Sequence, residues 1–193
     1  MDLKFVVIVT CSLFGTSLAV MFDDTAGGYA DVWKALSESD AFAVVKQNDT
    51  MPGLECESVR IKSKDIKNRR LDAVFAFRDP KAKQYKQNVL QMSTSKHGQV
   101  PFDNIVTMKS AKVFGELGKY ELLYSKDGCL ILRTPWWHPP NRMSFIHQRS
   151  SCEMWMVATK ADKVTAACVG HYKTVCNDPL ARALWGKHCV VPK

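Results

Sequence analysis

The segment Tyr120-Glu-Leu-Leu-Tyr-Ser-Lys-Asp-Gly-Cys-Leu-Ile-Leu132 contains the clearest structural signal in the chain. Apolar and aromatic residues flank Asp127-Gly128 on both sides, and an Asp-Gly pair readily adopts the two positive φ angles of a type I′ turn. The pattern predicts a tight β-hairpin with strands over residues 120–124 and 129–132. The rest of the chain is therefore expected to contain further antiparallel strands.

Similar short extended runs occur before and after this hairpin, separated by Gly, Pro, Asn and Asp residues. Residues 31–36 and 162–174 instead have helical character, and Asp31 is a suitable N-cap for the first of these segments. The pattern predicts an all-β, up-and-down barrel of about eight strands, with an N-terminal helical turn and a C-terminal α-helix packed outside. Besides the hairpin, the segments expected to form strands are 41–45, 56–61, 71–77, 85–92, 104–114 and 152–157.

The N-terminal segment has the features of a secretory signal peptide. Lys4 precedes an apolar run over residues 5–14, and Ser17-Leu18-Ala19 supplies small residues at a cleavage spacing. The run is too short to span a bilayer, and charged residues interrupt every later apolar run. The sequence therefore predicts a secreted, extracellular protein with a signal peptide over residues 1–19 and a single domain over residues 20–193.

The formal net charge is +8, which favours anionic partners in general. Lysine and arginine residues are, however, distributed along the whole chain. The densest cluster, residues 62–70, contains Asp65 and is typical of a solvated hairpin. We therefore expect no nucleic-acid partner and no membrane partner, and we expect the protein to be a monomer.

Cysteine usage indicates an oxidising compartment. The chain has seven cysteines, of which Cys11 belongs to the predicted signal peptide, so an even number remains to form disulfides. Spacing alone does not decide the pairing. No Cys-x-x-Cys is present, and His171 and His188 lack the usual companions of a zinc site, so we expect no metal. The cysteines expected to form disulfides are Cys56, Cys129, Cys152, Cys168, Cys176 and Cys189.

Sequence motifs of common enzymes are absent. The chain contains no Gly-x-Ser-x-Gly, His-Glu-x-x-His, P-loop or Gly-x-Gly-x-x-Gly pattern. Cysteines paired in disulfides are not available as nucleophiles. The sequence therefore predicts a binding protein rather than an enzyme, with no catalytic residue and no cofactor.

Three features resemble the tick salivary lipocalins related to the histamine-binding proteins. The early segment combines Asp31 to Leu36 with Ala41 to Val45 and Asn48-Asp-Thr50. Cys152-Glu-Met-Trp155 is similar to the family's late-strand motif of an acid, an aliphatic residue and an aromatic residue. The tail repeats the family's cysteines as Cys168, Cys176 and Cys189. The Gly-x-Trp signature of other lipocalins is absent, and Trp33 instead follows Asp31-Val32.

This resemblance implies a lipocalin barrel that sequesters host mediators, with a biogenic amine such as histamine as the default ligand. Glu153 and Trp155 match one element of the amine-binding motif. Leu130 departs from the other element, because amine-binding relatives have an acid after the cysteine at that position. The departure favours one alternative, a scavenger of leukotriene-type lipid mediators. A second alternative is an inhibitor that binds a complement protein through its outer loops.

Glu153 and Trp155 lie two residues apart and so face the same side of their strand. If that side is the barrel interior, Glu153 can pair with an ammonium group while Trp155 stacks on it. Alternatively, the pair faces solvent, or Glu153 bonds an arginine such as Arg133. The other residues expected to line the ligand site or the core are the aromatic residues Phe75, Phe77, Tyr120 and Tyr124.

The family resemblance also implies the disulfide pairs Cys56–Cys176, Cys129–Cys152 and Cys168–Cys189. The loop that contains Trp136-Trp137 is expected to cover the barrel mouth or to bind a partner. Asn48-Asp-Thr50 is an N-glycosylation sequon, and we expect Asn48 to be glycosylated in a secreted chain.

Overall fold

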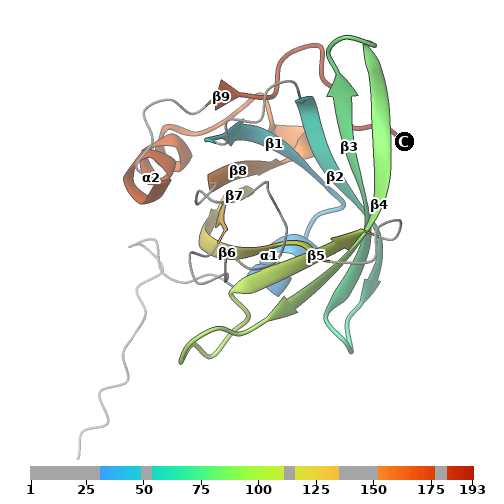
Figure 1. Cartoon of the computed structure of the whole chain (residues 1–193). Helices are drawn as coiled ribbons and strands as arrows, with labels where there is room; N and C mark the ends of the chain where they lie inside the picture. Colours follow the sequence, from blue (N-terminus) through green and yellow to red (C-terminus); the bar gives the residue numbers. More distant parts are fainter. Residues whose placement is uncertain (1–30, 49–53, 111–115, 135–151, 177–181) are drawn as a thin grey trace, which may run out of the picture.

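A computed structural model of the chain describes residues 31–48, 54–110, 116–134, 152–176 and 182–193. Eight antiparallel strands follow one another around a barrel, and pairing of β1 with β2 closes it (Figure 1). This arrangement confirms the predicted fold class. The strands are β1 (Ala41–Gln47), β2 (Glu55–Asp65), β3 (Arg70–Asp79), β4 (Gln84–Ser95), β5 (Ile105–Ser110), β6 (Glu116–Lys126), β7 (Cys129–Arg133) and β8 (Cys152–Val157).

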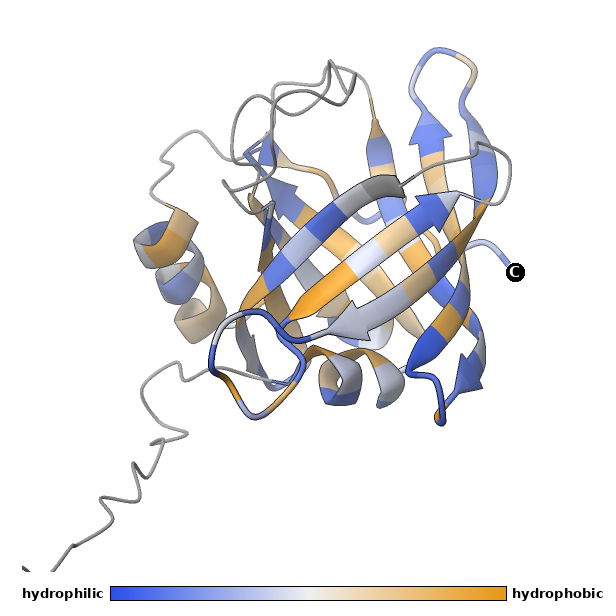
Figure 2. Ribbon diagram, turned by 60° about the horizontal axis from the view of Figure 1, so that its bottom comes forward, coloured by the Kyte–Doolittle hydropathy of each residue, from blue (hydrophilic) through white to orange (hydrophobic). Residues whose placement is uncertain are grey.

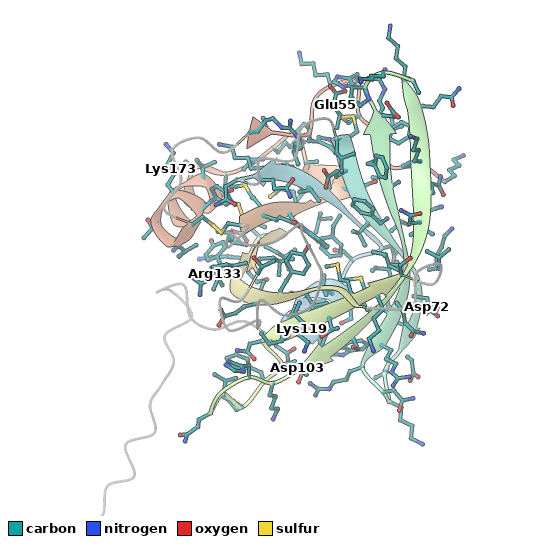
Figure 3. All side chains as sticks on the ribbon, in the orientation of Figure 1. Glu55, Asp72, Asp103, Lys119, Arg133 and Lys173 are labelled. Carbon is teal, nitrogen blue, oxygen red and sulfur yellow. A yellow bond between two sulfur atoms is a disulfide. The ribbon has the colours of Figure 1, made fainter. Side chains whose placement is uncertain are left out.

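The short helix α1 (Val32–Ser37) lies across one end of the barrel (Figure 1). The Asp31 carboxylate caps it by accepting a hydrogen bond from the Lys34 amide at 3.1 Å, as the sequence predicts. Val32 and Leu36 are fully buried in the apolar cluster of the barrel interior. Because connections alternate between the two ends of an up-and-down barrel, the turns β2–β3, β4–β5 and β6–β7 share this closed end. Asp103 lies at this closed end, and Glu55 lies at the opposite, open end (Figure 3).

Side chains alternate between the interior and the outer face along each strand, and Figure 2 shows the resulting bands of hydrophobic and hydrophilic residues. The inner residues pack into one apolar cluster with α1. Complete burial of one such side chain contributes about 1.5–3 kcal/mol, so this cluster stabilises the barrel. Its buried members on the strands are Phe42, Val44, Val59, Ile61, Leu71, Ala73, Leu90, Met92, Val106, Met108, Leu122, Leu130, Leu132 and Trp155.

A second apolar cluster lies outside the barrel, between the sheet and the helix α2 (Ala166–Cys176). Figure 1 shows α2 beside the barrel wall, as the sequence predicts. The helix begins later than predicted because the 3₁₀ turn η1 (Ala158–Lys160) comes first, and because the Thr165 hydroxyl accepts from the Cys168 amide at 3.2 Å. Cys168 and Tyr172 share the buried face of α2, whereas Val164 packs against the cluster from the segment before the helix.

The predicted hairpin is present between β6 and β7. Lys126 pairs with Cys129, so only Asp127 and Gly128 form the turn, and their φ angles are 54° and 85°. Two consecutive positive φ angles are the signature of the type I′ turn that the Asp-Gly pair predicts.

All six predicted cysteines form disulfides, but the three pairings expected from the family resemblance are wrong. The structure pairs Cys56 with Cys189, Cys129 with Cys168 and Cys152 with Cys176, at Cα–Cα distances of 5.1, 6.2 and 5.8 Å. The reason is the course of the chain after β8. Helix α2 runs along the outer face of the barrel and places its first and last cysteines beside β7 and β8, and the tail then passes to β2.

The C-terminal segment completes the barrel wall, which the sequence does not predict. Direct pairing of β1 with β2 ends at Ala43 and Ser58, and the short strand β9 (Arg182–Ala183) pairs with the end of β1. Leu184 then bridges the two strands, because its amide donates to the Val45 carbonyl at 3.1 Å and its carbonyl accepts from the Cys56 amide at 2.9 Å. Within the described residues, neither helix is long and apolar enough to cross a membrane.

Candidate ligand-binding site

Glu153 and Trp155 of β8 lie on the inner face of the barrel. Trp155 belongs to the interior cluster, whereas Cys152, Met154 and Met156 belong to the outer one. The indole Nε1 of Trp155 donates to Glu153 Oε2 at 2.7 Å, so the two side chains face the same way. Glu153 is 7 % exposed and Trp155 is 2 % exposed. The predicted acid–aromatic pair therefore forms one buried unit inside the barrel.

The surroundings of this pair are apolar on the β7 side. Leu130 is paired with Trp155 and Leu132 with Glu153 in the register of β7 and β8. Leu130 thus occupies an interior position next to the indole, so the departure from the family's motif lies within the barrel. On the other side, Phe42 lies 6.2 Å from Trp155 between ring centroids, at an interplanar angle of 44°.

The alternative partner Arg133 lies on the outer face. Its Nη2 donates to Glu121 Oε2 at 3.0 Å, and Glu121 faces Arg133 across the β6–β7 ladder. The alternative in which Glu153 bonds Arg133 is therefore wrong, because Arg133 bonds Glu121 instead.

Three of the predicted aromatic residues also face the interior. Phe75 packs against the interior cluster. The ring centroids of Phe75 and Phe77 lie 5.8 Å apart. Tyr120 packs against the same cluster from β6. Its ring lies over Gly118, where an added Cβ would meet Tyr120 Cε2 at 3.2 Å. These residues thus form the interior wall on the side of β3 and β6.

Tyr124 lies outside the barrel, and its expected place in the ligand site is not supported. Its ring stacks on His171 of α2 at 4.2 Å between centroids. Burial and the charge of Asp127 raise the pKa of Tyr124 above its usual value. The cause is a β-bulge between Leu122 and Tyr124, which shifts the register and turns Tyr124 to the opposite face from Tyr120.

Glu57 is an interior carboxylate that the sequence analysis missed. Among the described residues the buried carboxylates are Glu57, Asp103 and Glu153. Asp103 lies at the closed end, where it accepts from the Thr94 hydroxyl and pairs with Arg69 Nη1 at 3.0 Å. Glu57 could have been found from the alternation over residues 56–61, because it lies two residues before Val59 on the same face.

At the open end, the turn between β3 and β4 holds a charged pair. Lys86 Nζ donates to Asp79 Oδ2 at 2.7 Å, and the amides of Lys81 and Ala82 donate to Asp79 Oδ1. The hydrogen bond from Lys86, together with these amides, lowers the pKa of Asp79 to about 2. Asp79 therefore stays ionised at neutral pH and balances the charge of Lys86 at the rim.

Asn48 and the cluster around the Cys56–Cys189 disulfide lie within the described residues. The Asn48 carboxamide Oδ1 accepts from the Cys152 amide at 2.6 Å, so this hydrogen bond does not use Nδ2, the atom to which a glycan would be attached. Cys56, His188 and Cys189 lie close enough together for a metal, but both sulfur atoms are tied in a disulfide. Trp136-Trp137 and the predicted signal peptide lie outside the described residues.

The fold defines the class of protein, which is a lipocalin-like barrel. It resembles japanin from Rhipicephalus appendiculatus bound to cholesterol, at a TM-score of 0.55 and 11% identity over 78% of this chain and 95% of that chain. It also resembles AM182 in a serotonin complex, at a TM-score of 0.60 and 14% identity over 84% of this chain and 94% of that chain. The siderocalin Ex-FABP matches at a TM-score of 0.50 and 10% identity, over 77% of this chain and 94% of that chain.

The profile of the tick histamine-binding protein family matches residues 21–191. The chain therefore belongs to that family, as its motifs indicate. No curated protein matches the chain at the level of sequence. Two of these neighbours contain a small molecule, cholesterol in japanin and serotonin in AM182, and the interior of this barrel contains a buried carboxylate, Glu153, beside the Trp155 indole.

Proposed function

We propose that this protein binds a small biogenic amine of the histamine type inside its barrel and thereby sequesters a host mediator. The observation that supports this proposal is the buried carboxylate of Glu153 beside the indole of Trp155. A carboxylate in an apolar interior costs free energy unless hydrogen-bond donors or a cation compensate for the lost water. An ammonium group would add a positive charge and N–H donors to the partners that Glu153 already has, such as the Trp155 indole.

The Trp155 indole positions the acid for such a ligand. Its N–H engages one oxygen of Glu153, and a carboxylate has acceptor sites for further donors. The indole ring is also within reach of a cation bound to Glu153, and such contacts contribute about 0.5–2 kcal/mol. Sequestration needs affinity and no chemical step, which agrees with a fold whose relatives bind small molecules.

We further infer that the protein is secreted and acts outside the cell. The three disulfides support an oxidising compartment, and the apolar N-terminal segment has the composition of a signal peptide. Glycosylation of Asn48 belongs to the same proposal. Its Nδ2 does not take part in the hydrogen bond to Cys152, so a glycan there is compatible with that contact.

A lipid mediator is the second candidate ligand. The observation that favours it is Leu130, which lies inside the barrel beside Trp155 where amine-binding relatives have an acid. The apolar interior cluster, to which Leu130 belongs, would suit contact with a hydrocarbon chain or ring system. In this case the Glu153–Trp155 pair would be a structural feature of the wall rather than a ligand contact.

Calorimetric titration with histamine, serotonin and a leukotriene separates these candidates. Glu153→Gln keeps the shape of the side chain and removes its charge, so amine binding should weaken by about 1.5–3 kcal/mol, which is roughly one to two decades in Kd. Glu121→Gln, on the outer face, is the matched control and should leave amine binding unchanged. Equal amine affinity in the native protein and Glu153→Gln would overturn the proposal, and binding of the leukotriene alone would favour the lipid candidate.

A further inference from the structure

Strands β1 and β2 are paired directly over only part of their length. Their shared ladder ends at Ala43 and Ser58. Beyond this point β1 continues to Gln47 along β8, and β2 reaches back to Glu55 along β3. The two strands are therefore not hydrogen-bonded to each other toward the open end of the barrel. We call the place between these two strand ends the seam.

The C-terminal segment, residues 182–193, fills the seam. β9 pairs with the end of β1, as Figure 1 shows. The next residue, Leu184, donates to the Val45 carbonyl of β1 and accepts from the Cys56 amide of β2. The Leu184 side chain is 5 % exposed and belongs to the interior cluster, so it is part of the inner wall. If Leu184 left this position, the interior would be open to water between β1 and β2.

Most of the C-terminal segment lies at the surface of the barrel. Leu184 is its one buried residue, and the hydrogen bond from the Arg182 side chain to the Leu54 carbonyl is exposed. A segment with few buried contacts and exposed hydrogen bonds opens locally at a low cost in free energy. The disulfide Cys56–Cys189 ties the segment covalently to β2 and therefore opposes this opening.

The Cys56–Cys189 disulfide has one cysteine within reach of solvent. Cys189 is half-buried and lies between exposed residues, whereas Cys56 is fully buried on β2. A thiolate that exchanges with this disulfide would therefore attack the Cys189 sulfur. Cys129 and Cys168, by contrast, are both buried between the sheet and α2. We therefore expect a reductant in solution to reach Cys56–Cys189 before Cys129–Cys168.

We propose that the C-terminal segment is a latch on a lateral opening of the barrel, and that thiol–disulfide exchange at Cys56–Cys189 releases it. A dithiol reductant gives two electrons and two protons to the disulfide, so Cys56 and Cys189 become thiols and the reductant becomes a disulfide. Leu184 can then leave the seam, and a molecule inside the barrel gains an exit through the wall. This inference concerns the wall, so it holds for an amine and for a lipid alike.

Hydrogen exchange measured by mass spectrometry tests the latch without a ligand. In the double variant Cys56→Ser, Cys189→Ser, the amides of residue 56 and Leu184 should exchange at least about 10-fold faster than in the native protein. The directly paired residues 41–43 should change by less than about 3-fold. The matched control is Cys129→Ser, Cys168→Ser, which also removes one disulfide but leaves the seam intact, so Leu184 should exchange there at nearly the native rate.

Reduction of the native protein by dithiothreitol is a second measurement, which remains decisive if the first variant does not fold. Alkylation and peptide mapping identify the disulfide that opens, and Cys56–Cys189 should open before Cys129–Cys168. Seam amides that keep their native exchange rate after this opening would overturn the latch. Exchange that rises equally in all eight strands would overturn it as well, because it reports global unfolding.

Histamine is the probe for the exit through the wall. Where the native protein binds it, the dissociation rate measured by stopped flow should rise at least about 10-fold in Cys56→Ser, Cys189→Ser and stay native in the control variant. An unchanged rate in the first variant would overturn the exit and leave the amine proposal intact. If the native protein binds no histamine, the amine proposal fails, and hydrogen exchange still decides whether the latch exists.

Discussion

The indole nitrogen of Trp155 donates a hydrogen bond of 2.7 Å to the carboxylate of Glu153, two residues earlier on the same strand. Both side chains are buried, so the bond fixes the orientation of an acid inside an apolar barrel. In an acid-x-aromatic motif on a strand, the acid and the aromatic residue lie two positions apart. Their side chains therefore point to the same face of the sheet.

Replacement of Trp155 by Phe tests this relationship. Trp155→Phe keeps an aromatic ring in the interior and removes the N–H donor, so the free energy of unfolding should fall by about 1–3 kcal/mol and amine affinity should fall with it. Thermal unfolding and calorimetric titration measure the two effects. Trp185→Phe, at the outer cluster, is the control and should leave amine affinity at the native value.

The two tyrosines of β6 should behave differently. Tyr124→Ala removes a buried ring from beneath α2 and should cost about 3–5 kcal/mol of stability without changing amine affinity. Tyr120→Ala removes a ring from the interior and should reduce ligand affinity. Denaturant unfolding and titration of both variants check the assignment. A loss of affinity in folded Tyr124→Ala would contradict the outward position of this residue.

The sequence predicts much of the fold because its signals are local. Asp127-Gly128 determines a turn, Asp31 caps a helix, and the eight predicted strands occur near their predicted bounds. The position of Tyr124 could not be predicted in this way. Tyr120 and Tyr124 share a face only if the strand is regular, and the bulge between them depends on how β6 pairs with β7.

The disulfide pairing likewise depends on contacts between distant parts of the chain. Cysteine spacing does not reveal that α2 runs along the outer wall or that the tail returns to β2, so the pairings expected from resemblance are wrong. Glu57 was missed for a related reason. Alternation over residues 56–61 places Glu57 on the face of Val59, and the closed barrel then shows that this face points inward.

The observed disulfide pairs lead to a prediction of graded stability. Loop-closure entropy predicts that Cys56–Cys189, Cys129–Cys168 and Cys152–Cys176 contribute about 5, 4 and 3 kcal/mol, since they span 133, 39 and 24 residues. Double Cys→Ser variants should lose stability in that order in denaturant unfolding. Non-reducing peptide mapping tests the pairs themselves, and a peptide linking Cys56 to Cys176 would contradict them.

Replacement by alanine should change stability in opposite directions at Gly128 and Gly170. Gly128→Ala should destabilise the protein by about 1–3 kcal/mol, because φ at this position is 85° and the new Cβ would meet Val157 Cγ2 at 3.1 Å. Gly170→Ala should instead stabilise α2 by about 0.5–1 kcal/mol, because nothing lies within 4 Å of its added Cβ. Thermal unfolding of the two variants gives the comparison, and equal shifts would be inconsistent with the type I′ turn.

The most direct test of the central claim is a crystal structure of the protein grown with histamine. The proposed function predicts one histamine molecule inside the barrel, with its ammonium nitrogen about 2.7–3.2 Å from the Glu153 carboxylate and beside the Trp155 ring. Histamine bound only on the outer face, or a lipid in contact with Trp155 and no amine inside, would contradict the account.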